Sequence, residues 1–256
     1  TLVRVTLPEL VDLHGCELTK ATNSHAAPCP WTSIARGYFA ATASDPAALD
    51  AAMWWVWEQF IATSRPNGET GAAATRPPRP PDGRLLPGKA LVERGSWKLP
   101  SEPLLAPIRA GIAHDLAIDG TAETVPWTDV CGRGASLKQQ RAFAEDLAAF
   151  LHGKWFETWF VQELLALAPS DLQSSIATNV EIRRRTSDVP AELDVVLIDG
   201  YQLFVFSCTT TRNRGHAKQK AIEAIHRARQ FGGDEARPVF ATLLPPTGGR
   251  NDASVA

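Results

Sequence analysis

Two acidic residues and the strand that follows them are the part of this sequence best suited to chemistry. Glu157 ends the run F-L-H-G-K-W-F-E, and Asp194 stands in the run E-L-D-V-V. Carboxylate oxygens are the ligands that Mg²⁺ and Mn²⁺ prefer, and a metal ion so held can activate water beside a phosphate. If the fold brings Glu157 and Asp194 within about 8 Å of each other, as the motif match described below implies, the two carboxylates can hold a hydrated divalent ion.

The alternation of side chains along a strand extends this prediction to neighbouring residues. Glu192 and Asp194 are two residues apart, as are Ser207 and Thr209, so each pair is expected to share one face of its strand. Asp199-Gly200 is a turn sequence between the two strands. A hairpin at this turn would bring Asp194 close to Ser207 and Thr209, in a pocket.

These motifs resemble those of the PD-(D/E)XK restriction-endonuclease-like domain of CRISPR-associated (type III ancillary) effector nucleases that carry a CARF sensor. The family runs are close to F-L-N-G-G-W-L-E, N-E-x-D-V and E-C-K-T, and this chain has F-L-H-G-K-W-F-E, A-E-L-D-V and S-C-T-T. The resemblance covers residues 143–244. It implies a homodimeric defence protein that uses Mg²⁺ or Mn²⁺ to cut DNA or RNA. It also implies activation by cyclic oligoadenylate, through a sensor that is not recognisable in this chain.

The third motif departs from the family pattern at two positions. Ser207 replaces the family's metal-binding glutamate, and Thr209 replaces its catalytic lysine. The resemblance therefore implies a catalytically impaired domain that still binds nucleic acid. Two alternatives remain open: a non-catalytic dimerisation or scaffold module, and an active nuclease in which Glu192 supplies the acid and Lys218 or Lys220 supplies the lysine.

Basic residues cluster after the third motif. Residues 207–229 hold six Lys and Arg and one Glu, a net charge of +5, and residues 183–185 are all Arg. Such a rim suits the phosphate backbone, which binds cations without sequence preference. The predicted nucleic-acid-binding residues are Arg183, Arg184, Arg212, Arg214, Lys218 and Lys220.

The predicted fold class is α/β, with a restriction-endonuclease-like core (α-β-β-β-α-β) in residues 140–256. Apolar periodicity predicts a helix over 136–167 that bends at Gly153. Strands are predicted at 175–184, 192–198, 201–208 and 237–244, and a helix over 215–231. Residues 1–139 are predicted to form a mostly helical region. Within that region, helices are expected over 7–13 and 104–116 and a strand over 124–130, and the Pro-rich stretch 65–89 is typical of a loop or linker.

Composition narrows the class of protein without deciding its function. The chain has 256 residues, of which 44% are hydrophobic, and a net charge of −2, as expected of a globular protein rather than a uniformly basic nucleic-acid binder. The four cysteines form no C-x-x-C pair, which predicts reduced thiols and a cytoplasmic location. Neither a signal peptide nor a run of about 20 apolar residues is present, so no membrane partner is expected.

Overall fold

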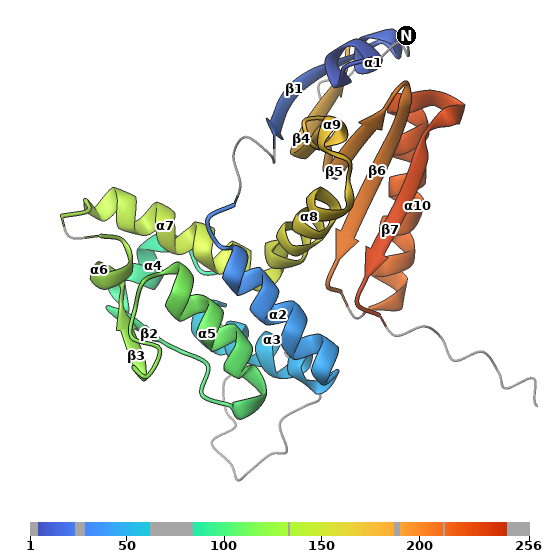
Figure 1. Cartoon of the computed structure of the whole chain (residues 1–256). Coiled ribbons are helices and arrows are strands. Elements are labelled where there is room, and N and C mark those ends of the chain that lie inside the picture. Colours follow the sequence, from blue (N-terminus) through green and yellow to red (C-terminus); the bar gives the residue numbers. More distant parts are fainter. Residues whose placement is uncertain are drawn as a thin grey trace, which may run out of the picture. The chain divides into compact units, whose positions relative to one another are not determined.

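The computed structural model describes residues 5–23, 29–61, 84–132, 134–186, 190–211 and 213–244 (Figure 1). The chain divides into two compact units. One, the helical unit, is Cys29–Phe160, and the other, the sheet unit, joins Thr1–Pro28 to Val161–Ala256. The division differs from the predicted boundary at residue 139, because the N-terminal segment adds a strand to the sheet formed by the C-terminal part.

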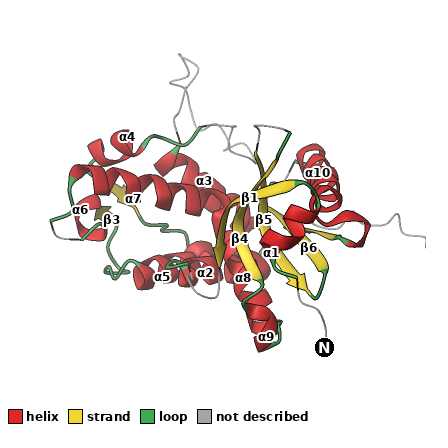
Figure 2. Ribbon diagram, turned by 90° about the horizontal axis from the view of Figure 1, so that it is seen from above, coloured by secondary structure: helices red, strands yellow, loops and turns green. Residues whose placement is uncertain are grey.

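Helices make up most of the helical unit (Figure 2). Its elements are α2 (Thr32–Ser44), α3 (Ala47–Phe60), α4 (Gly88–Glu93), β2 (Ser96–Lys98), η1 (Pro103–Leu105), α5 (Ala106–Asp115), β3 (Thr124–Pro126), α6 (Trp127–Val130) and α7 (Leu137–Ala149). The predicted strand over 124–130 is only half right, since its second half is α6. Of the predicted loop over 65–89, residues 65–83 lie outside the described residues, and residues 88–89 open α4.

Aromatic side chains form the core of the helical unit. Trp55, Phe60, Trp97 and Trp127 are all buried, and their ring centroids lie 5.7–6.4 Å apart in a chain of edge and tilted contacts. The indole N–H of Trp127 donates to the Leu91 carbonyl at 2.8 Å, so its polar edge is satisfied.

The predicted helix over 136–167 is present as three consecutive helical segments. α7 begins at a capping box in which Ser136 and Gln139 exchange hydrogen bonds. A turn of π-helix (η2, Phe150–Lys154) contains Gly153, where the sequence predicts a bend, and α8 (Trp155–Leu167) follows. Glu157, in the first turn of α8, belongs to the helical unit, whereas Val161–Leu167 belong to the sheet unit.

The sheet unit is built on one five-stranded mixed sheet of order β1-β4-β5-β6-β7. Its elements are α1 (Leu7–Leu13), β1 (Cys16–Asn23), α9 (Ser170–Gln173), β4 (Ile176–Arg184), β5 (Pro190–Asp199), β6 (Gln202–Thr209), α10 (Arg214–Gly232), η3 (Gly233–Glu235) and β7 (Arg237–Thr242). Only the β6 to β7 pairing is parallel, and α10 makes the crossover between these two strands. The elements from α8 to β7 follow the predicted order, with β1 and α9 as additions.

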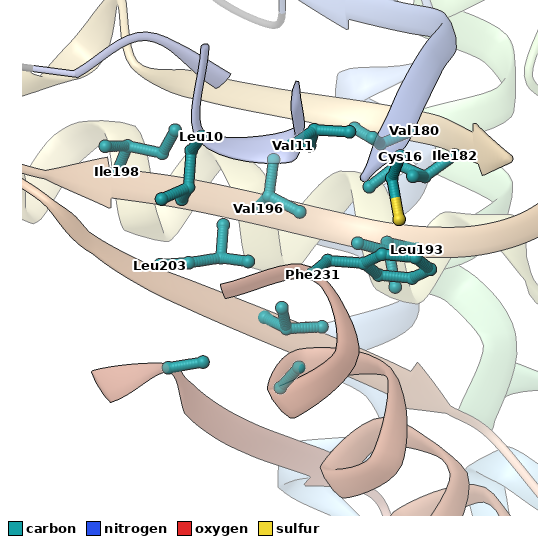
Figure 3. Close-up of a cluster of buried hydrophobic side chains, with 13 residues drawn as sticks. Leu10, Val11, Cys16, Val180, Ile182, Leu193, Val196, Ile198, Leu203 and Phe231 are labelled. Carbon is teal, nitrogen blue, oxygen red and sulfur yellow. The ribbon is translucent and has the colours of Figure 1, made fainter. Parts of the chain in front are cut away.

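One buried cluster joins α1 and α10 to the sheet (Figure 3). Leu10 and Val11 come from α1 and Phe231 from α10, and they meet Leu203 and Val196 of the sheet. A Cβ atom at Gly232 would lie 2.8 Å from the Cβ of Leu203, so α10 packs against β6 here too closely for a side chain. In the part of the chain that the structure describes, no helix has the length and apolar character needed to cross a membrane.

β4 and β5 share an irregularity at Asn179 and Asp194. The ladder pairs Val180 with Leu193 and Thr178 with Val195, and Asn179 stands opposite Asp194 between these pairs. Asn179 has a φ of 49°, in the left-handed region that asparagine tolerates better than most residues. Leu193 and Val196 both join the core cluster although three residues separate them. A regular strand would put them on opposite faces, so the alternation changes phase at this kink.

We expect Asn179→Val to destabilise the sheet unit by about 1–2 kcal/mol, because a β-branched residue resists a positive φ. Asn179→Gly is the matched control and should be close to neutral, since glycine adopts this conformation freely. Urea unfolding followed by circular dichroism measures both changes. Equal stability of the valine and glycine variants would show that the kink does not require the left-handed conformation.

Candidate functional site

Asp194 binds β6 through its side chain at the point where the β5 to β6 ladder ends. The last backbone pair at this end of the ladder is Val195 with Phe206. Beyond it, Asp194 Oδ2 accepts the backbone N–H of Cys208 at 2.8 Å and the hydroxyl of Ser207 at 3.3 Å. The carboxylate thus replaces a backbone acceptor, and the structure brings Asp194 and Ser207 together, as the predicted hairpin requires.

A small pocket, open to solvent, lies where Asp194 and Ser207 meet α10. Lys220 lines it, whereas Lys218 and Thr209 are not among its lining residues. The residues around it are Glu192, Leu193, Asp194, Val205, Phe206, Ser207, Lys220, Glu223, Ala224 and Arg227. Of the two lysines proposed as replacements, Lys220 is therefore the one beside Asp194.

Glu192 borders the same pocket, and its backbone carbonyl forms a hydrogen bond there. Arg227 donates hydrogen bonds to the Glu192 carbonyl oxygen and to the Glu223 carboxylate. Glu192 pairs across the ladder with Glu181 and precedes Leu193, which faces the core. Glu192 is exposed, and its role as a metal ligand stays a prediction.

The structure leaves the predicted metal site divided between the two units. Glu157 lies in the helical unit and Asp194 in the sheet unit, so their pairing across a metal ion stays a prediction. Among the described residues, no group of three or more His, Cys, Asp or Glu side chains is placed to hold a metal ion. Near Asp194, the Ser207 hydroxyl and the Cys208 amide N–H both donate hydrogen to its Oδ2. A metal ion at this carboxylate stays a prediction.

Thr209 has a local structural role. Its side-chain oxygen accepts the backbone N–H of Thr211 at 3.2 Å, and the Thr211 hydroxyl oxygen accepts that of Asn213 at 3.3 Å. The Asn213 side chain in turn caps α10 through the N–H groups of Gly215 and His216. Thr209 thus helps to shape the connection from β6 to α10.

The predicted basic rim separates into paired and unpaired cations. Arg183 forms an ion pair with Glu17 at 3.0 Å, and Arg185 binds Asp12. Arg184 is exposed, and Arg212 lies outside the described residues. Arg214 and Lys218, on the first turns of α10, are exposed and have no ion pair with any described residue, as is also true of Lys220. The unpaired charge available for phosphate is therefore concentrated at the start of α10.

Two features of the site were missed by reasoning from the sequence. Nothing in local patterning marks Asn179 as a left-handed residue, or the Cys208 N–H as the partner of Asp194. The pairing of Arg227 with Glu223, by contrast, follows the helical i,i+4 spacing and was accessible to sequence analysis.

Comparison with known proteins identifies the fold alone. No protein-family model matches the chain, and no curated protein matches it. Among solved structures, it is similar to VC1899 from Vibrio cholerae, with 13% identity, a TM-score of 0.57 and coverage of 94% of this chain and 53% of VC1899. It is also similar to Can2 from Sulfobacillus thermosulfidooxidans in complex with cyclic tetra-adenylate, with 14% identity, a TM-score of 0.49 and coverage of 95% of this chain and 53% of Can2. The chain therefore spans about half the length of the structures it matches. The likeness to VC1899 shows a shared mixed α/β fold.

We predict that Asp194→Ala destabilises the sheet unit by about 1–3 kcal/mol, because it removes the acceptor for the Cys208 N–H. Asp194→Asn keeps a side-chain oxygen and should lose less. Hydrogen exchange of the Cys208 amide, measured beside urea unfolding, should be faster in the alanine variant. Unchanged exchange and unchanged stability in that variant would contradict a structural role for the carboxylate.

Proposed function

We propose that the sheet unit is a nuclease-like, nucleic-acid-binding domain of a CRISPR-associated defence protein, with a degenerate metal site. The observation that carries this proposal is the hydrogen bond between Ser207 and Asp194. Ser207, which stands where the family has its second acid, lies beside Asp194, which matches the first acid. It offers a neutral hydroxyl where the family has a negative charge. The motif match and the order of elements from α8 to β7 support the same ancestry.

The degenerate site lacks the two groups that metal-dependent cleavage uses beside Asp194. A second carboxylate would hold the metal ion, which shields the scissile phosphate and activates water, and a lysine would stabilise the developing negative charge. Ser207 supplies no charge, and the Thr209 oxygen accepts a hydrogen bond from the chain itself. Loss of one catalytic group commonly costs roughly 10²–10⁴ in rate, which is the basis for proposing an impaired enzyme.

Binding of nucleic acid, unlike cleavage, requires no metal site and needs only cationic side chains that can contact phosphate. Arg214, Lys218 and Lys220 lie within the first two turns of α10, whose N-terminal end also carries partial positive charge. Ammonium and guanidinium groups so placed bind phosphates without reading sequence. We therefore assign backbone binding to this end of α10, and we propose Mg²⁺ or Mn²⁺ as a cofactor only of an active form.

Two further candidates rest on particular observations. An active nuclease with a relocated lysine is favoured by Lys220, which lines the pocket beside Asp194. A non-catalytic dimerisation or scaffold module is the other candidate, and Ile222 and Ile225, exposed on α10, offer apolar surface to a protein partner. The following two experiments separate these candidates from the impaired nuclease.

The binding experiment removes the unpaired cations. We expect the Arg214→Ala, Lys218→Ala, Lys220→Ala triple variant to bind single and double strands more weakly, to a similar extent for each sequence. The slope of log affinity against log salt should fall by roughly 1 for each phosphate that no longer has a cationic partner. Fluorescence anisotropy at several salt concentrations measures both effects.

The matched control removes three cations of the same unit that already have acidic partners: Lys20, Arg183 and Arg185. This variant should retain most of the affinity and most of the salt dependence. Unchanged affinity in the α10 triple variant would favour the scaffold function. An equally large decrease in the control would show that binding does not depend on α10 in particular.

The catalytic experiment restores the family pattern with Ser207→Glu and Thr209→Lys. We expect Mn²⁺-dependent cleavage of labelled DNA or RNA to appear or to rise strongly, provided that Glu157 and Asp194 hold the remaining half of the site. Adding Asp194→Asn to the restored chain should abolish the gain. Robust cleavage by the unaltered chain, abolished by Lys220→Ala, would show that the lysine has relocated.

A further inference from the structure

The outer side of α10 carries a stripe of two isoleucines between two cations. Lys218, Ile222, Ile225 and Arg229 are separated by four, three and four residues, so they form one row along the helix. We call these four residues the α10 stripe. Ile222 is 46% exposed and Ile225 40% exposed, and both cations are exposed.

The isoleucines lie outside the buried core cluster of the sheet unit. α10 buries Ala217, Ala224, Ala228 and Phe231 on another side, where the last two enter the core cluster. Single exposed apolar residues are ordinary on protein surfaces. Two large ones on adjacent turns, bordered by charge, form instead a small apolar centre with a polar rim, which is the anatomy of a protein interface.

The two cations of the α10 stripe have no acidic partner among the described residues. Lys218 and Arg229 form no ion pair within that part of the chain, and Glu223, the one acid of α10, binds Arg227 outside the stripe. An occupant must therefore supply negative charges about 16 Å apart, the length of eleven residues of helix, with apolar surface between them.

The symmetry of the pattern opposes a second copy of this chain as the occupant. The order cation, isoleucine, isoleucine, cation is the same in both directions, with the same spacing. Two copies packed along the stripe would bring cation against cation in a parallel or an antiparallel arrangement. A phosphate backbone would satisfy the cations, but it would leave both isoleucines facing charged phosphate, and base stacking uses aromatic side chains.

We propose that the α10 stripe docks an acidic amphipathic helix of a partner protein, with the pattern acid-x₃-apolar-x₂-apolar-x₃-acid. Such a helix places a carboxylate at Lys218 and at Arg229 and covers Ile222 and Ile225 with its own apolar residues. This interaction goes beyond nucleic-acid binding. It shares Lys218 with the proposed phosphate surface, so the docked helix and a nucleic acid should compete.

The test uses a designed alanine-rich helical peptide of about 18 residues that contains Glu-x₃-Leu-x₂-Leu-x₃-Glu. We expect saturable binding to the full chain in fluorescence anisotropy, weakened about tenfold or more by the Ile222→Ser, Ile225→Ser double variant. Lys218→Glu with Arg229→Glu should abolish binding of this peptide and create binding of its Lys-for-Glu counterpart. Tyr201→Ser, which changes another exposed apolar residue of the same unit, is the matched control and should have no effect.

Three results would overturn the proposal. The first is absence of saturable peptide binding, or binding that the Ile222→Ser, Ile225→Ser variant retains. The second is self-association of the chain that this variant abolishes, which would assign the stripe to a second copy. The third is weaker oligonucleotide binding by this variant without peptide binding, which would assign the stripe to nucleic acid. Failure of the proposed function would be recognised separately, as absence of oligonucleotide binding by the unaltered chain.

Discussion

The carboxylate of Asp194 and the backbone N–H of Cys208 form the hydrogen bond on which the site depends. Backbone pairing between β5 and β6 stops at Val195 and Phe206, and the side chain of Asp194 continues it across the gap. The same oxygen accepts the hydroxyl of Ser207, so the negative charge is met by two hydrogen-bond donors of the chain itself. An acid satisfied in this way is stable without a cation.

The backbone kink at Asn179 lies opposite Asp194 on the neighbouring strand and helps to place the Asp194 carboxylate. The alternation of side chains changes phase on β4 and β5 at the level of Asn179 and Asp194. Asp194 therefore departs from the regular alternation of β5, and its side chain reaches β6 just beyond the last backbone pair of the two strands. The segments that follow β6 in the chain supply the other groups near Asp194. Thr209 and Asn213 shape the turn that starts α10, and α10 brings Lys220 to the pocket. The backbone kink and the capped turn before α10 thus determine which charged side chains lie near Asp194.

Much of the sheet unit could be predicted from the sequence, because its signals are local. Apolar periodicity predicts the long helical region around Gly153, and the Asp199-Gly200 turn predicts the hairpin of β5 and β6. The division into units could not be predicted, since the pairing of β1 with β4 joins residues more than 150 positions apart. Simple alternation could not predict that Leu193 and Val196 both join the core cluster, because it fails at the kink. Strand 124–130 was half wrong because a proline ends it before Trp127 begins a short helix.

A structure determined from crystals soaked in Mn²⁺ tests the central claim most directly, through the anomalous signal of the metal. We predict that Asp194 keeps its hydrogen bonds to the Cys208 amide and the Ser207 hydroxyl in the presence of Mn²⁺. A structure in which Mn²⁺ binds the Asp194 carboxylate and the bond to the Cys208 amide is broken would contradict this claim.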